Sequence, residues 1–178
     1  MLADFDPQPV LTGDAFRLRP MAAGDLDPLF AVAGEPELWA QHPARERWRH
    51  EVFAPYFEFL LGTGTTLVFE DRARGDLAGC SRYYDVPDQP SDIAIGFTML
   101  GRAWWGGASN RAIKTLMLGH AFASYQLVWF HIAPENIRSQ RGTAKLGAVH
   151  DYDAVLDLGT GPAELQCWRL PREVWEGA

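Results

Sequence analysis

The feature that most constrains the fold is a succession of short segments between residues 92 and 132. A strand-like run at 92–100 is followed by a glycine-rich turn, WWGGASN, at 104–110. Residues 109–125 then carry apolar side chains at helical spacing. The continuous apolar run LVWFHI at 127–132 is typical of a strand covered on both faces. A strand, a tight turn, a helix and a second strand in this order predict a domain in which the helix packs on a sheet.

The other predicted elements extend this sheet and cover it. Strand patterns occur at 15–19, 66–70, 77–86 and on both sides of the turn GTGP at 159–162, and helix patterns at 24–33, 45–61 and 136–146. Pro55 is expected to kink or divide the helix at 45–61. Turn-rich joints between the strands before the glycine-rich turn predict an antiparallel meander. We therefore expect an α/β (α+β) fold with a mixed, mostly antiparallel sheet of about seven strands and about four helices.

Length and charge restrict the class of protein. The chain of 178 residues is long enough for a single domain spanning 1–178, with a loose or edge-lying start at 1–14. Its net charge of −7 disfavours nucleic acid and anionic membranes as partners and favours cationic or amine-bearing ones. No window reaches the roughly 18 apolar residues of a membrane span. Cys80 and Cys167 have no metal-binding spacing, so we expect packing residues, no metal site and a cytoplasmic location.

The glycine-rich turn is interpreted as an anion cradle. Such a turn exposes backbone N–H groups at the start of the next helix, where they can bind phosphate oxygens. A P-loop needs Gly-Lys-Ser/Thr, but Lys114 lies more than a turn inside the helix. A dinucleotide fingerprint follows the first strand of a parallel unit, whereas the strands before this turn have an antiparallel pattern. Trp104 and Trp105 are expected to hold the turn against the sheet as scaffold.

Three short segments resemble the RimJ/RimL-like branch of the GNAT superfamily of acyl-CoA-dependent N-acetyltransferases. In chain order they are Ile95-Gly96-Phe97, then Trp105-Gly106-Gly107-Ala108-Ser109-Asn110, then Asn136-Ile137-Arg138-Ser139 with Lys145-Leu146-Gly147-Ala148. The resemblance covers roughly Phe16 to Leu170. One position departs from the superfamily's pyrophosphate motif: Ala103 stands where Gln or Arg is usual. Arg102 and Arg111 are candidates for the missing charge.

The resemblance implies a sheet that splays between the strands at 92–100 and 127–132 to admit acetyl-CoA. Residues 15–100 would include the acceptor side, 101–147 the CoA-binding core and 148–178 the closing strands. The cofactor-binding residues that the resemblance implies are Phe97, Thr98, Met99, Trp105, Gly106, Gly107, Ala108, Ser109, Asn110, Asn136 and Ser139. The structural alternative is that the glycines only permit a tight turn.

Ser139 is the candidate acid. In RimL-like enzymes the serine of N-x-x-S lies beside the CoA sulfur and is proposed to protonate the leaving thiolate. The tyrosine that many other members use later in this helix is absent from residues 140–145, which favours the serine. Helix capping is the structural alternative, because Asn136 is a good N-cap and Ser139 occupies the third helical position.

The candidate bases are Asp92 and His131. Some members carry a glutamate where this chain has Ala94, and Asp92 lies one strand period earlier on the same face. His131 has a suitable ordinary pKa. The structural alternative for Asp92 is a solvated turn residue, and the alternative for His131 is a histidine that only packs in the fold. Glu70 and Asp85 are further candidates, and a desolvated amine can react without a dedicated base.

The resemblance implies an N-acetyltransferase that moves the acetyl group of acetyl-CoA to a primary amine, on a protein N-terminus or a small molecule, by direct attack. The alternatives are a degenerate domain that binds CoA as a regulatory module and a transferase of another acyl group. The chain is expected to be a monomer or homodimer. Aromatic residues at helical spacing are expected in the core rather than in an acceptor pocket, namely Trp39, Trp48, Phe53, Tyr56 and Phe57. Arg45, Arg47 and Arg49 are expected on a solvated helix face rather than at an anion site.

Overall fold

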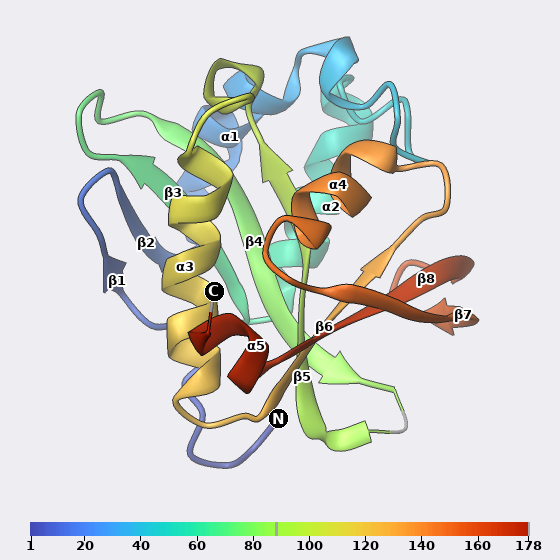
Figure 1. Ribbon diagram of the computed structural model, residues 1–178. Coiled ribbons are helices and arrows are strands. Elements are labelled where there is room, and N and C mark those ends of the chain that lie inside the picture. The colour runs from blue at the N-terminus through green and yellow to red at the C-terminus, as the bar shows by residue number, and fades with distance from the viewer. Residues whose placement is uncertain (88, 178) are drawn as a thin grey trace.

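The protein forms a curled sheet with helices on both faces, as a computed structural model of residues 1–87 and 89–177 shows (Figure 1). The eight strands are ordered β1-β2-β3-β4-β5-β6-β8-β7. They are β1 (Leu11–Thr12), β2 (Phe16–Pro20), β3 (Thr66–Asp71), β4 (Leu77–Val86), β5 (Gln89–Leu100), β6 (Leu127–Ile132), β7 (Val149–Asp157) and β8 (Pro162–Pro171). Every neighbouring pair is antiparallel except β5 with β6. The predicted mixed, mostly antiparallel sheet is confirmed.

The helices of the described chain cover the sheet from both sides. The α-helices are α1 (Leu26–Ala33), α2 (His50–Gly62), α3 (Ser109–Phe122), α4 (Ile137–Ala144) and α5 (Arg172–Glu176), and short 3-10 helices occur as η1 (Ala23–Asp25), η2 (Pro36–Leu38) and η3 (Arg102–Trp104). The alternation of β3 shows how the core divides. Leu67 and Phe69 pack in the cluster that includes α3, whereas Val68 packs in the cluster that includes α1 and α2. The sheet therefore separates two apolar cores.

The strands β5 and β6 diverge after two paired positions. Ile93 pairs with Val128 and Ala94 pairs with Trp129, and no pairing follows. The register of β5 with β4 also shifts beside Phe97, whose φ of 54° lies in the left-handed region. Because the ladder to β6 stops at Ala94, the edge of β5 from Ile95 onward offers unpaired backbone groups. The predicted splay between these two strands is confirmed.

Three predictions about the helices need correction. α2 begins at His50 rather than at residue 45, because Arg49 has an extended backbone. Pro55 does not divide α2, since its missing hydrogen bond would reach Glu51 in the exposed first turn of the helix. The start of the chain lies at the edge of the sheet, where β1 pairs with β2, and Phe5 anchors it because this side chain is buried and packs edge-on against Tyr83. β1 and α5 were not predicted, and α3 ends at residue 122 rather than 125.

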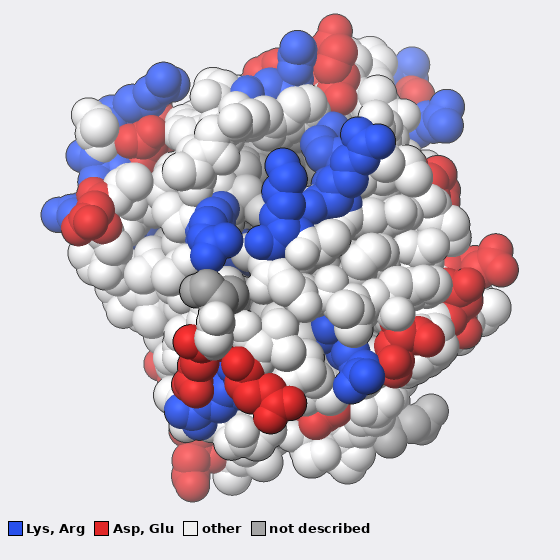
Figure 2. All heavy atoms as spheres, in the orientation of Figure 1, with Lys and Arg blue, Asp and Glu red and all other residues white. Residues whose placement is uncertain are grey.

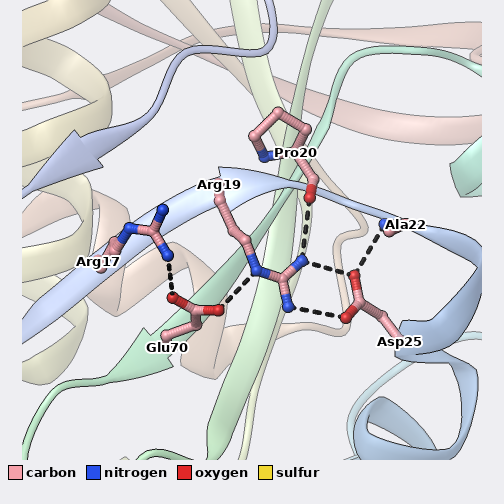
Figure 3. Close-up of polar contacts among 6 residues, drawn as sticks. All are labelled: Arg17, Arg19, Pro20, Ala22, Asp25 and Glu70. Carbon is pink, nitrogen blue, oxygen red and sulfur yellow. Dashed lines mark hydrogen bonds and ion pairs between the residues drawn. The ribbon is translucent and has the colours of Figure 1, made fainter.

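An ion-pair network fixes the start of α1 on the sheet (Figure 3). The Arg19 guanidinium donates two hydrogen bonds of 2.8 Å to the Asp25 carboxylate and one of 2.5 Å to Glu70. Arg17 donates to the other oxygen of Glu70 at 2.9 Å. Burial raises the pKa of Asp25, but the hydrogen bonds from Arg19 and from the Ala22 N–H outweigh it, so the net pKa is lowered. This network joins β2, β3 and α1 and supports the second core.

Candidate functional site

A cleft with a volume of about 1380 Å³ opens where β5 and β6 diverge. Its walls come from the end of β5, the turn before α3, the end of β6, α4, the segment before α2 and the loop between β7 and β8. Of the residues predicted to bind the cofactor, those that line the cleft are Phe97, Thr98, Met99, Trp105, Gly106, Gly107, Ala108, Asn110, Asn136 and Ser139. Ser109 does not line it. Segments far apart in the sequence thus meet at one opening.

The glycine-rich turn presents an uncapped helix start to this cleft. The N-cap residue of α3 is Ala108, and no side chain caps the first-turn N–H groups of the helix. Gly106 has a φ of 74°, and a Cβ at Gly106 or Gly107 would meet nothing within 4 Å. The backbone is therefore bare and open to a ligand. An uncapped helix start of this kind is suited to bind phosphate.

Both tryptophans of the turn are tied to the sheet by their indole N–H groups. Trp104 donates to the Asp71 carboxylate at 2.7 Å, and Trp105 donates to the Leu100 carbonyl at 2.6 Å. The Arg138 guanidinium from α4 lies 4.0 Å from the centre of the Trp105 ring. These contacts agree with the predicted scaffold role of the tryptophans.

The charge that lines the cleft is positive, although the net charge of the chain is −7. The charged residues among the described lining are Arg47, Arg111, Lys114, Arg138, Arg141 and Lys145, with no Asp or Glu. Figure 2 shows Lys and Arg gathered around the hollowed middle of this face, while many acidic side chains lie toward its edges. The expectation from net charge is therefore reversed at the cleft. Of the two arginines proposed to replace the usual motif charge, Arg111 lines the cleft and Arg102 pairs with Glu35 and Glu37.

Lys114 is a buried lysine at the cleft wall that the sequence prediction did not include in the site. Its side chain leaves α3 toward the sheet, where Nζ donates to Thr98 Oγ1 at 2.8 Å and to Ser81 Oγ at 3.4 Å. The residue is only 5% exposed. Burial lowers the pKa of this amine to about 7. The sequence held one signal of this burial: Lys114 lies three residues before Met117 and so shares the buried face of α3.

Asn136 and Ser139 meet at the start of α4. The Asn136 side chain accepts a hydrogen bond of 3.2 Å from the Ser139 N–H, so Asn136 is the predicted N-cap. The Ser139 hydroxyl makes no hydrogen bond to any described residue. The same helix start also binds the segment before α2, because the Arg138 guanidinium donates to the Leu38 carbonyl at 2.9 Å and the Arg138 N–H donates to the Gln41 side chain at 3.2 Å.

His131 lines the cleft with Tyr84, a residue that the sequence prediction missed. The Tyr84 hydroxyl lies 3.0 Å from His131 Nδ1, and His131 Nε2 has no hydrogen-bond partner among the described residues. Burial lowers the pKa of His131 to about 4, so the ring is neutral at neutral pH. Tyr84 lies on the same face of β4 as Cys80 and Arg82, and the period of two was the available signal.

The acidic candidates lie outside the cleft lining. Asp92 accepts a hydrogen bond of 2.9 Å from the Trp129 indole N–H. Glu70 binds Arg17 and Arg19, and Asp85 pairs with the amino group of the chain start. The structure thus brings together Ser139 and His131 but leaves these three carboxylates elsewhere.

The aromatic residues that were predicted to lie in the core divide between the core and the cleft. Phe53 and Phe57 are fully buried in the second core, as predicted, and Trp48 is partly buried against it. Trp39 and Tyr56 pack in that core and also line the cleft.

The prediction of a solvated helix face for the three arginines before α2 was wrong, although two of the three are exposed. Arg45 and Arg49 are exposed, but Arg47 is only partly exposed and lies 3.6 Å from the centre of the Tyr56 ring. Because α2 begins only at His50, these residues lie in turns and do not share a helix face.

Two further observations concern the whole of the described chain. Cys80 and Cys167 are both free and buried, which confirms their predicted packing role. No helix among the described residues has the length and apolar character needed to cross a membrane.

Comparisons with known proteins identify a family from the sequence and a shared fold from solved structures. Residues 16–149 match the family model described as an acetyltransferase (GNAT) domain. A GCN5-related N-acetyltransferase from Brucella melitensis superposes with a TM-score of 0.80 at 17% identity, over 98% of this chain and 86% of that one. A GNAT-family acetyltransferase from Bacillus anthracis gives 0.74 at 11% identity, over 93% and 99%. No curated protein matches the chain.

A spermidine N-acetyltransferase from Vibrio cholerae, solved in complex with CoA and spermine, gives a TM-score of 0.66 at 13% identity, over 92% of this chain and 99% of that one. At these identities the three structures show a shared fold.

Proposed function

Because this chain belongs to the RimJ/RimL-like GNAT acetyltransferases, an enzyme family that uses acyl-CoA, we propose that it transfers the acetyl group of acetyl-CoA to a primary amine by direct attack. The observation that carries the proposal is the meeting of an uncapped helix start, a cluster of cations and an unpaired strand edge in one cleft. Each of these features suits one part of a CoA ester. No covalent acyl-enzyme is required.

The residues at the glycine-rich turn would bind the pyrophosphate. The N–H groups from Gly106 to Asn110 lie at the positive end of the α3 dipole, and Arg111 stands in the first turn. On α4, Arg141 and Lys145 add positive charge to the same cleft. Arg111 would supply the charge that Ala103 lacks.

The edge of β5 would bind the pantetheine arm and position the thioester. Beyond Ala94 its backbone has no neighbour on the β6 side, so the amides of the arm can hydrogen-bond to it as a strand would. At Phe97 the left-handed backbone interrupts the ladder with β4. A backbone N–H at Phe97 or Thr98 is then free to stabilise the oxyanion. Bound acetyl-CoA supplies the electrophilic carbonyl and the thiolate leaving group.

Proton transfer is assigned to residues on opposite walls of the cleft. Ser139, whose hydroxyl has no protein partner among the described residues, would protonate the departing thiolate and take a proton from solvent in return. On the sheet side, the Tyr84 hydroxyl can donate a hydrogen bond to His131 Nδ1. When the amine gives a proton to the Tyr84 oxygen, Tyr84 can pass its own proton to His131. His131 is the proposed base because it is neutral and close to Tyr84, whereas Asp92 is held by Trp129 outside the cleft.

A CoA-binding regulatory module is the second candidate. It is favoured by Ala94, which is buried and stands where some members carry a glutamate, and by the absence of tyrosine from residues 140–145. In this case CoA would bind without turnover.

A thiol-release assay with acetyl-CoA and a panel of amines, run beside calorimetry of CoA binding, separates the candidates. The proposal expects binding and amine-dependent release of CoA. Binding without release on any amine would favour the module. Release with a longer acyl-CoA but not with acetyl-CoA would identify a transferase of another acyl group.

A further inference from the structure

The acceptor end of the cleft contains two hydrogen-bond donors that face each other without an acceptor between them. His42 Nδ1 accepts a hydrogen bond of 2.9 Å from the Ala44 N–H, so the proton of the neutral ring must be on Nε2. This Nε2–H lies 3.5 Å from the Arg47 guanidinium, which has only donors. Protonation of His42 would leave Nε2 a donor as well. The pair therefore lacks an acceptor in either protonation state.

Arg47 is a partly buried cation with no carboxylate partner among the described residues. Its guanidinium lies 3.6 Å from the Tyr56 ring centre and 5.6 Å from that of Trp39, and all its polar neighbours are uncharged or cationic. Burial lowers the pKa of Arg47, which shows that the site disfavours the charge that it holds. The contact with the Tyr56 ring stabilises this guanidinium in part, and an anion supplied by a ligand would offset the remaining cost of its desolvation.

A second guanidinium, that of Arg82, has no carboxylate partner among the described residues and donates one long hydrogen bond of 3.5 Å from Nε to the Tyr83 carbonyl. Arg82 on β4 is 4.8 Å from the Phe97 ring centre and 5.6 Å from that of Phe59, the ring that stacks on Tyr56. Its NH1 group is buried and has no hydrogen-bond partner among the described residues. Burial lowers the pKa of Arg82, and Asp85, the carboxylate that opposes this shift, pairs with the chain start and does not line the cleft. Arg47 and His42 thus line the cleft without an acceptor, whereas Arg82 lies outside its lining.

We infer that the acceptor amine carries a carboxylate, which accepts hydrogen bonds from Arg47 and His42 while the amine faces the thioester. This inference rests on the proposed acetyl transfer and narrows its substrate class. A polyamine or another polycation is disfavoured as the acceptor, because Arg47 and Arg138 line this end of the cleft and no Asp or Glu is among its described lining residues. The carboxylate comes either from a free amino acid or from an acidic side chain close to a peptide N-terminus.

The test compares acceptors that differ only in the carboxylate, with kcat/KM for CoA release as the readout. One arm pairs free amino acids with their primary amides, a second pairs N-terminal peptides carrying Glu with the same peptides carrying Gln, and spermidine is the cationic acceptor. We expect the acid to exceed its neutral partner by roughly tenfold or more in one arm, since charge-assisted hydrogen bonds are the strong ones. The arm that shows the preference identifies the source of the carboxylate.

Variants connect the preference to the proposed residues. Arg47→Gln should bring the ratio of acid to neutral acceptor close to one, and Arg47→Lys should restore part of it. Arg45→Gln is the matched control, because Arg45 lies in the same segment but is exposed and outside the cleft. Circular dichroism and CoA affinity, both expected to be unchanged, show that each variant is folded.

A binding measurement distinguishes failure of this inference from failure of the proposed function. CoA-loaded protein is titrated with an N-acetylated amino acid and with its amide. If no amine is acetylated but the acid binds better than the amide in a manner that requires Arg47, the carboxylate site stands and the proposed transfer is wrong. If amines are acetylated with no preference for the acid, or with a preference that Arg47→Gln leaves unchanged, the inference is wrong and the transfer stands. If no amine is acetylated and the acid binds no better than the amide, both the inference and the proposed transfer are wrong.

Discussion

Replacing the buried Lys114 by Met should stabilise the protein at neutral pH. Lys114 is 5% exposed, has no carboxylate partner among the described residues and donates to the hydroxyls of Thr98 and Ser81. Those hydroxyls also hydrogen-bond to each other at 2.8 Å, so they keep a partner when the amine is removed. Met fills a similar volume without a charge to desolvate.

The size of the effect follows from the pKa. Burial lowers the pKa of Lys114 from 10.5 to about 7, and each pKa unit corresponds to about 1.4 kcal/mol, so the cost of burying this group is roughly 4 kcal/mol at pH 7. Loss of the hydrogen bond to Thr98 and imperfect packing of Met should reduce the gain in the free energy of unfolding by about 1–2 kcal/mol. The expected net gain in the free energy of unfolding is therefore about 2–3 kcal/mol.

The sign of the pH dependence makes the prediction specific. Between pH 7 and pH 10.5 the unfolded chain holds a proton on Lys114 that the folded protein lacks, so the free energy of unfolding of the wild type rises with pH across this window. Lys114→Met lacks this term. Its advantage should shrink with rising pH and be gone by about pH 10.

Urea unfolding of both proteins at pH 7, 8.5 and 10, followed by circular dichroism, measures this difference. Lys145→Met is the matched control, because Lys145 is the other lysine of the chain and is exposed. That substitution should change the free energy of unfolding by less than about 0.5 kcal/mol. A destabilised Lys114→Met at pH 7, or a gain of the same size at pH 7 and pH 10, would refute the reasoning.

Three further predictions concern the proposed acid, the proposed base and the ion-pair network. Ser139→Ala should slow CoA release by roughly a hundredfold or more while leaving CoA affinity within about twofold; unaltered turnover would remove Ser139 from the mechanism. Burial lowers the pKa of His131 from 6.5 to about 4, so the unfolded chain is protonated there first and the free energy of unfolding falls as the pH drops through this window. His131→Gln should slow transfer and reduce that acid sensitivity, and equal slopes in urea titrations would contradict this. Asp25→Asn should cost about 1–3 kcal/mol in urea unfolding, against less than about 1 kcal/mol for Arg17→Gln, whose ion pair is more exposed; equal losses would contradict the assigned role of the network.

The strands of the sheet were predictable because their signals are local, whereas the splay was predicted from the resemblance to the GNAT superfamily. β3 alternates between two cores, and the apolar stripe of α3 follows the helical period. β1 and α5 escaped prediction because segments of two and five residues are too short to show a period. The start of α2 was misplaced because Trp48 continues the apolar spacing of the helix, although the backbone becomes helical only after Arg49.

The candidate site was predictable only where its chemistry belongs to a contiguous segment. The turn at Gly106 works through its own backbone, so its residues suffice to indicate an anion cradle. The properties of Lys114, Tyr84 and Arg47 depend instead on neighbours that the fold brings together from distant segments. Net charge failed as a guide for the same reason, because the acidic residues lie outside the described lining of the cleft.

Isothermal titration calorimetry with CoA tests most directly the claim that the cleft between β5 and β6 binds the cofactor at the start of α3. The wild type should bind one CoA per chain. Gly106→Pro should abolish binding without unfolding the protein, because proline removes an N–H and cannot adopt the φ of 74° found at this position. Failure of the wild type to bind CoA, or binding of equal strength by Gly106→Pro, would contradict the account.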